Sequence, residues 1–246
     1  MGSPAAVAVT DGRGALVALA ALARRYGLDE RQRERLATLL AILERDERAP
    51  TAVRVAGEAI EVHVADVLVG LELEPVRSAQ RLVDIGAGAG FPGLVLAVAL
   101  AERDVALLES QSRKCEFLRD TVARLGLAKV QVVDERAESW SAGMGAHDLA
   151  VARAVAAQPV LLEYAAPLLR LGGALVDWRG RRSAAEEDAA LRAAAALGMR
   201  REAICRVEPF AGARDRHLHV FVKSAETPPR FPRRAGIARK RPLARA

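Results

Sequence analysis

The fold of this chain is decided by Leu82-Val83-Asp84-Ile85-Gly86-Ala87-Gly88-Ala89-Gly90-Phe91-Pro92-Gly93. A short apolar run with one acid is followed by four glycines within eight residues, which is typical of a buried strand that turns sharply into a helix. The glycines remove Cβ atoms where the backbone must approach a ligand closely. We therefore expect a nucleotide-like ligand at this turn.

Two ligands compete for the turn. The spacing from Gly88 through Gly90 to Gly93 satisfies G-x-G-x-x-G, the pattern of dinucleotide-binding loops. A pyrophosphate prefers bare N–H groups without a nearby anion, whereas S-adenosylmethionine carries an ammonium and a sulfonium and tolerates acids. Asp84 lies two residues before Gly86 and favours S-adenosylmethionine as the cofactor. We assign Asp84 to the cofactor site, and a nicotinamide oxidoreductase stays the alternative.

A second strand is expected at residues 104–109, and it ends at Glu109. A carboxylate at the end of this strand is placed to accept the ribose hydroxyls of either ligand. Without the upstream glycines, a solvated acid at a strand end would be the simpler interpretation.

Composition indicates one globular domain with extensions. The chain has 246 residues, of which 51% are hydrophobic and only 4% aromatic, so aliphatic side chains carry the core. Two distant cysteines without a CxxC pair suit a reducing cytoplasm. The four histidines are too dispersed for a metal site. The apolar run at 15–23 is too short for a membrane span and is interpreted as an amphipathic helix.

Hydrophobic periodicity divides the chain into three parts. We expect an N-terminal helical extension over 1–72, with 1–14 disordered and helices at 15–26, 29–47 and 57–72. Over 73–224, strands at 81–86, 104–109, 129–133, 148–153 and 174–179 alternate with helices at 92–101, 112–125, 158–170 and 183–197. This alternation predicts an α/β fold with a mostly parallel, doubly wound sheet. Strands at 202–208 and 216–223 lack an intervening helix and predict a C-terminal antiparallel hairpin.

The third part, 225–246, is a basic tail. Residues 230–246 contain seven Arg or Lys and no acid, which leaves 30 basic against 31 acidic residues in the rest of the chain. A Pro-, Gly- and Arg-rich segment predicts an extended, flexible tail that neutralises phosphates. A solubilising tail without a partner is the alternative.

Ligands of such sheets lie beyond the carboxyl ends of the strands. After the third strand, a backbone N–H and the carboxylate within 135–138 could read an adenine edge. Arg153, Arg179, Arg216 and His217 stand at the ends or starts of later strands. A single arginine is most often a solvated surface residue, but three on one rim beside a cofactor loop indicate a binding surface.

At this point the sequence resembles the RsmG (GidB) methyltransferases, which methylate N7 of one guanine in small-subunit ribosomal RNA. Matching segments run from 63–66 to 231–236, and the most particular are Arg216-His217-Leu218 and Pro232-Arg233-Arg234-Ala235-Gly236. The resemblance implies a class I methyltransferase fold and S-adenosyl-L-methionine as cofactor. It also implies small-subunit RNA or its particle as partner. We expect no metal and no membrane partner, and we expect a monomer.

The resemblance also implies roles for single residues. The cofactor would be surrounded by Gly86, Gly88, Gly90, Phe91, Glu109, Ala137, Glu138 and Arg153. RNA would face Lys114, Arg136, Arg179 and Arg216, to which we add His217 and the tail residues Arg233 and Arg234. The family's Asn-Leu-Thr is here replaced at Ala49-Pro50-Thr51, and its His-x-x-Asp-Ser ends in Val67. These departures bear on substrate fit.

The expected chemistry needs no catalytic side chain. Guanine N7 has an in-plane lone pair, so transfer is a direct displacement that requires alignment and no general base. The chain lacks the Asn/Asp-Pro-Pro-Tyr of amino-group methyltransferases. A cationic product ring would be opposed by an Arg pressed against it, so we expect Arg153 to contact the cofactor carboxylate or a phosphate. A class I methyltransferase with another substrate, and a ribosome-assembly module without turnover, stay as alternatives.

Overall fold

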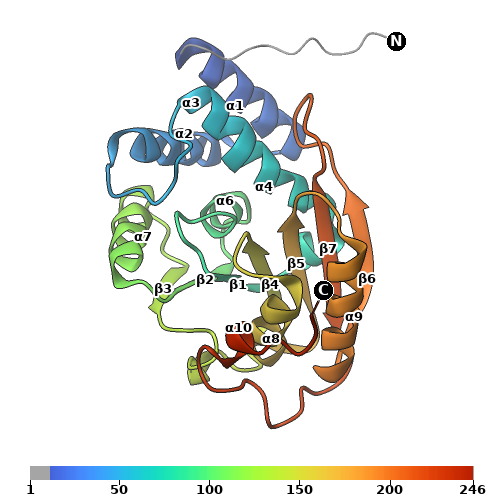
Figure 1. The fold of residues 1–246 in the computed structure, drawn as a ribbon. Coiled ribbons are helices and arrows are strands. Elements are labelled where there is room, and N and C mark those ends of the chain that lie inside the picture. The colour runs from blue at the N-terminus through green and yellow to red at the C-terminus, as the bar shows by residue number, and fades with distance from the viewer. Residues whose placement is uncertain (1–11, 246) are drawn as a thin grey trace.

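A seven-stranded sheet forms the centre of the computed structural model, which describes residues 12–245 (Figure 1). The strands lie in the order β3-β2-β1-β4-β5-β7-β6. Their bounds are β1 Arg81–Ile85, β2 Asp104–Glu109, β3 Val130–Asp134, β4 His147–Arg153, β5 Leu169–Arg179, β6 Met199–Arg206 and β7 His217–Lys223. The first five are parallel, and β7 is antiparallel to both β5 and β6. The predicted fold class, including the antiparallel C-terminal pair, is confirmed.

Alternate residues of each strand enter two separate apolar clusters, as a sheet covered on both faces requires. In β1, Leu82 belongs to one cluster and Val83 to the other. The first face is covered by α1 Gly12–Tyr26, α2 Glu30–Arg45, the helical segment 56–72, α6 Gly93–Ala99 and α7 Ser112–Leu125. The second face is covered by α8 Gln158–Leu168, α9 Ala184–Ala196 and the segment with α10 Ile237–Lys240.

The helical segment 56–72 covers the range predicted as the third helix, but its geometry is irregular. It runs through α3 Ala56–Ala59, a π-helical turn Ile60–Ala65, α4 Asp66–Leu68 and a 3-10 turn Val69–Glu72, and α5 Glu74–Ser78 follows. Single π turns inside helices often occur at functional sites because they change the direction of the side chains that follow. Here the turn contains His63 and ends directly before Asp66.

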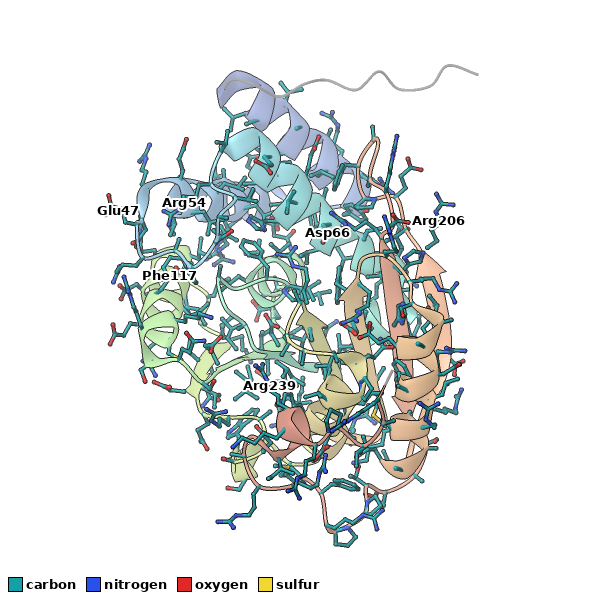
Figure 2. All side chains as sticks on the ribbon, in the orientation of Figure 1. Glu47, Arg54, Asp66, Phe117, Arg206 and Arg239 are labelled. Carbon is teal, nitrogen blue, oxygen red and sulfur yellow. The ribbon has the colours of Figure 1, made fainter. Side chains whose placement is uncertain are left out.

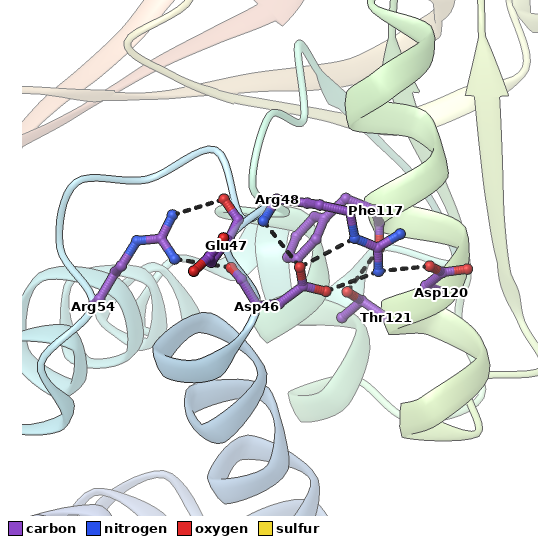
Figure 3. A network of polar contacts seen from close by, with 7 residues as sticks. All are labelled: Asp46, Glu47, Arg48, Arg54, Phe117, Asp120 and Thr121. Carbon is purple, nitrogen blue, oxygen red and sulfur yellow. Dashed lines mark hydrogen bonds and ion pairs between the residues drawn. The ribbon is translucent and has the colours of Figure 1, made fainter.

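The loop between α2 and this segment is held by arginines (Figure 3). Arg48 forms ion pairs with Asp46 and with Asp120 of α7, at 2.9 and 2.8 Å. Arg54 donates to the carbonyl oxygens of Asp46, Glu47 and Ala49 at 2.9 to 3.2 Å. The loop is therefore fixed against α7, although it carries the sequence departure at Ala49-Pro50. The other departure, Val67, is fully buried in the core.

The tail was predicted to be flexible, but residues within 231–238 pack against the fold. Phe231 and Ala238 are buried against the second face of the sheet. Arg233, expected to face RNA, donates from Nε to Oε1 of Glu163 at 2.6 Å, and Glu163 has no exposed surface. The composition predicts a mobile chain, but a buried carboxylate on α8 needs a cation and the tail supplies it. Lys and Arg counts alone do not reveal such a pairing.

At the N-terminal end of the chain, α1 begins at Gly12, so the range 1–14 predicted to be disordered extends too far. Residues 1–11 lie outside the described residues. Within 12–245, no helix is long and apolar enough to cross a membrane. The N-terminal helices share one apolar cluster with the sheet. The boundary at residue 72 stays a prediction.

We predict that Arg233→Ala destabilises the fold by about 3 to 5 kcal/mol, because it leaves the buried carboxylate of Glu163 without its cation. Thermal and urea unfolding measure the effect. The matched control is Arg234→Ala, since Arg234 is adjacent and exposed. Equal stability of the two variants would show that the pair does not hold the tail.

Candidate cofactor and substrate pockets

The glycine turn closely approaches the loop that follows β4 and the buried Asp84 of β1. Gly86 has φ +71°, and a Cβ there would lie 3.0 Å from the side chain of Val155. At Gly93 a Cβ would lie 2.6 Å from Oδ2 of Asp84. The sequence folds this way because the loop can lie against the strand ends only where these Cβ atoms are missing.

The side chain of Asp84 holds the glycine loop through a hydrogen bond to the loop backbone. Its Oδ2 accepts a hydrogen bond from the Gly93 N–H at 2.8 Å, and the residue has no exposed surface. Its Oδ1 has no hydrogen-bond partner among the described residues. Burial raises the pKa of Asp84 to about 7, although the Gly93 N–H opposes this shift. Asp84 was assigned to the cofactor site, but this position gives it the role of holding the start of α6.

Glu109 ties the loop to the end of β2. Its Oε2 accepts from the Gly88 N–H at 3.0 Å, and its Oε1 accepts from Ser110 and Gln111 at 2.8 and 3.0 Å. A carboxylate has about four acceptor sites, so Glu109 can still accept from a ligand hydroxyl. Gly88 takes part in this contact through its backbone N–H.

A pocket of about 350 Å³ opens above the loop, and we call it the glycine-loop pocket. Its walls come from the carboxyl ends of β1 to β4, as expected for a ligand site on this type of sheet. The lining residues are Ile85, Gly86, Leu108, Glu109, Ser110, Gln111, Lys114, Glu135, Arg136, Ala137, Glu138, Ala154, Val155, Tyr164 and Arg239. Six predicted residues therefore meet here: Gly86, Glu109, Ala137, Glu138, Lys114 and Arg136.

Lys114 and Arg136 were predicted to face RNA, and the structure places them on the wall of this same pocket. Gly88, Gly90 and Phe91 were also predicted around the cofactor. They belong to the glycine loop, but they are not among the described residues that line this pocket. Phe91 is buried and stacks on His63 with ring centroids 4.3 Å apart.

A second pocket, of about 240 Å³, lies beside the first, and we call it the strand-end pocket. It brings together four predicted residues, Arg153, Arg179, Arg216 and His217, with side chains that were not predicted. The full lining is Val62, Asp66, Arg153, Ala154, Trp178, Arg179, Gly180, Val207, Arg216, His217 and Leu218. Ala154 lines both pockets and has φ +57°, which is unusual for a residue other than glycine and typical of strained functional positions.

Arg153 connects β4 with the irregular helical segment. Its Nη1 donates to the carbonyl oxygen of Val62 at 2.7 Å and to Oδ2 of Asp66 at 3.2 Å. Asp66 also pairs through Oδ1 with Nε of Arg216 at 3.3 Å (Asp66 is labelled in Figure 2). The carboxylate of Asp66 therefore lies between two guanidinium groups that belong to the wall of the strand-end pocket.

His63 is held neutral by this network. Arg153 Nη2 lies 3.2 Å from Nδ1, while Nε2 lies 3.2 Å from the Val53 carbonyl oxygen and 3.1 Å from Oγ1 of Thr51. Burial, followed by the charge of Arg153, lowers the pKa of His63 to about 4. A guanidinium can only donate, so Nδ1 accepts from Arg153 and Nε2 carries the proton.

Two predicted RNA contacts are engaged within the protein. Arg179 donates to the Ala156 carbonyl oxygen at 3.2 Å and forms an ion pair with Glu186. Arg233 is bound to Glu163, whereas Arg234 is exposed. The sequence interpretation missed Asp66, Trp178, Tyr164 and Arg239. Asp66 lies in the resembling segment 63–66 and could have been found there; Arg239 gave no signal, because the tail was expected to be mobile.

Within the described part of the chain, no group of three or more His, Cys, Asp or Glu side chains is arranged to hold a metal ion.

Comparison with known proteins points to one family. Residues 32–218 match the family model "GidB: rRNA small subunit methyltransferase G". Ribosomal RNA small subunit methyltransferase G of Rubrobacter xylanophilus is 43% identical over 187 residues, or 74% of this chain and 72% of that protein. The protein of the same name from Deinococcus radiodurans is 39% identical and covers 85% of both chains.

Solved structures agree on the fold. A cofactor-bound protein from MTB superposes with a TM-score of 0.54 at 22% identity, over 84% of this chain and 96% of that one. A SAM-dependent methyltransferase from Aquifex aeolicus gives a TM-score of 0.50 at 14% identity, over 75% of this chain and 96% of that one.

We predict that Asp84→Asn changes the pH dependence of stability. In the wild type, unfolded Asp84 ionises above pH 4 while the folded residue resists ionisation up to about pH 7. Its contribution to stability is thus fully present below pH 4 and lost as pH rises through about 7, by about 1.4 kcal/mol for each unit of difference in pKa. Asparagine keeps an acceptor for the Gly93 N–H and cannot ionise.

Urea unfolding of both proteins between pH 4 and 7 measures this effect. The stability of the wild type relative to Asp84→Asn should fall as pH rises. Asp177, another buried acid whose pKa burial raises to about 7, is present in both proteins and cancels from the difference. If the difference in stability between the wild type and Asp84→Asn stayed constant with pH, the raised pKa of Asp84 would be contradicted.

Proposed function

This chain belongs to the rRNA small subunit methyltransferase G family, and we propose that it transfers a methyl group from S-adenosylmethionine to N7 of a guanine in 16S ribosomal RNA. The observation that carries the proposal is the pair of pockets that meet at Ala154. A methyl transferase needs a site for the donor and a site for the acceptor in direct contact, and both lie at the carboxyl ends of the strands.

The glycine-loop pocket fits the methyl donor. Its volume lies within the range of small-ligand sites, and its apolar walls at Ile85, Leu108 and Val155 can cover an adenosine. Glu109 can accept from ribose hydroxyls, and Glu138 can accept from the amino group of adenine. When bound, S-adenosylmethionine supplies a methyl group on a positively charged sulfur. The acids of the pocket suit such a cation better than they suit a pyrophosphate.

The strand-end pocket suits a purine ring. Trp178, Val207 and Leu218 give it apolar surface, and Arg216 and His217 lie at its wall. Methylation makes the guanine ring cationic, which an uncompensated guanidinium would oppose. Asp66 reduces this repulsion, because its carboxylate pairs with both Arg153 and Arg216 and offsets one of their two charges. Arg153 thus serves to orient the helical segment 56–72 over the pocket, and its contact with the cofactor carboxylate stays a prediction.

The residues present match a reaction governed by alignment. N7 attacks with its own lone pair, so the protein has to hold the two partners in line and exclude water. Neither Cys115 nor Cys205 belongs to the described lining of either pocket. His63 could act as a base only if its ring were free, but both ring nitrogens are engaged.

Basic residues of the pocket walls and of the tail support an RNA substrate. Lys114, Arg136, Arg216, His217 and the exposed Arg234 are the groups we propose to contact phosphates. Arg179 and Arg233 are left out because acids of the protein bind their terminal guanidinium nitrogens, whereas Arg216 pairs with Asp66 through Nε. We further propose that the enzyme acts as a monomer in the cytoplasm, on RNA or on the small-subunit particle.

The proposed reaction is tested by transfer of a tritiated methyl group from S-adenosylmethionine to deproteinised 16S RNA and to small-subunit particles that lack the modification. Borohydride and aniline treatment, which cleaves RNA at 7-methylguanosine, maps the product. We expect one labelled guanine. Label on another atom or another RNA would contradict the proposal, and binding of cofactor without transfer to either substrate would favour an assembly module.

We predict that Gly86→Ala weakens binding of S-adenosylmethionine by about tenfold or more, because the added Cβ is strained at φ +71° and displaces Val155 from the pocket wall. Isothermal titration calorimetry measures the dissociation constant. Gly145→Ala is the matched control, since Gly145 has φ +62° with nothing within 4 Å and does not belong to the described pocket lining. Equal affinities of the two variants would exclude the turn from the cofactor site.

A further inference from the structure

The C-terminal segment 231–241 lies against the glycine-loop pocket and reaches into it. Figure 1 shows α10 beside α8, and Figure 2 labels Arg239 there. Arg239 is a lining residue of the pocket, although it lies 84 residues after Val155, to whose carbonyl oxygen it donates at 3.2 Å. One wall of the pocket is thus built by a part of the chain outside the sheet.

Three contacts fix this segment. Arg233 is bound to the fully buried Glu163, Ala238 is 1% exposed, and the Gly236 N–H donates to Oε1 of Glu138 at 2.9 Å. The last contact orients a pocket residue directly. Oε1 then keeps one acceptor site and Oε2 keeps both, so Glu138 can still accept hydrogen bonds from a ligand in the pocket.

Arg239 is an exposed residue whose side chain lies against the pocket wall. Its contacts are the Val155 carbonyl oxygen and the hydroxyl of Tyr164, whose pKa is raised by burial and then by the charge of Glu138. Ala137 and Glu138 form the neighbouring wall, while Glu109 and Ser110 belong to the end of β2. Tyr164 interacts with both Arg239 and Glu138, and Gly236 of the same segment binds Glu138, so Arg239 lies on the side of the pocket that carries Glu138.

The positive charge of Arg239 also favours a position at the adenine end of the cofactor. The methyl donor has a positive sulfur, so a guanidinium next to it would weaken binding. Adenine is neutral, its ring face attracts cations, and its ring nitrogens accept hydrogen bonds. An arginine in this pocket is favourable at the adenine end and unfavourable at the sulfur end.

The following inference rests on the proposed cofactor. We propose that the C-terminal segment completes the cofactor pocket and that Arg239 contacts the adenine of S-adenosylmethionine and positions it. The segment then acts in cofactor binding, in addition to any contact of its exposed cations with RNA. It follows that affinity for adenosine-containing ligands depends on one side chain of the tail.

The test uses the full chain with Arg239→Ala, and with Lys240→Ala as the matched control. Lys240 is adjacent, exposed and absent from the described lining of the pocket. Calorimetry measures the affinity for S-adenosylhomocysteine and for 5′-methylthioadenosine, which keeps the adenosine and lacks the amino-acid part. We expect Arg239→Ala to weaken both ligands by a similar factor of about ten, and Lys240→Ala to weaken neither. Thermal unfolding without ligand should show both variants as stable as the wild type.

Each other outcome overturns the inference. A loss confined to S-adenosylhomocysteine would place Arg239 at the amino-acid end, and no loss, or an equal loss in Lys240→Ala, would exclude a contact with the cofactor. A lower unfolding temperature of Arg239→Ala accompanying the loss would show a structural role only. If the wild type bound neither ligand, the proposed cofactor itself would fail, which is a separate result.

Discussion

The close approach of the glycine loop to two strand-end carboxylates is the constraint on which the rest of the structure depends. Asp84 accepts from Gly93 and Glu109 accepts from Gly88, so the same loop is fixed at its two ends by β1 and β2. Any Cβ at Gly93 would enter the space of Asp84. Because these side chains bind the backbone of the loop, they fix the start of α6, which is buried from Gly93 to Val98.

The second organising interaction lies at the end of β4. Arg153 connects this strand to the carbonyl oxygen of Val62 and to Asp66, and Asp66 connects onward to Arg216 at the start of β7. The irregular helical segment is thus attached to the sheet where the two pockets meet. The carboxylate of Asp66 lies between two guanidinium groups and offsets the charge of one of them, which reduces the positive charge beside a ring that becomes cationic on methylation. The positive φ of Ala154 lies at the same junction.

The sequence predicted the sheet well because its strands are apolar runs of β-branched and aliphatic residues bounded by turn signals, and the ranges 104–109 and 112–125 agree with β2 and α7 to the residue. It predicted the loop for the same local reason. The prediction from sequence failed where a residue distant in the sequence determines the local structure. The buried Glu163 converts Arg233 from a mobile cation into a fixed one, and Ala238 becomes buried only because α8 offers a surface. Periodicity could not show that Asp84 points beneath its loop, since residue spacing does not give the direction of a side chain.

A crystal structure of the protein with S-adenosylhomocysteine tests the central claim most directly. The account predicts the ligand in the glycine-loop pocket, its ribose at Glu109, its adenine between Glu138 and Arg239, and its sulfur directed past Ala154 toward the strand-end pocket. Adenosine bound in the strand-end pocket, or a ligand whose sulfur points away from Ala154, would contradict it.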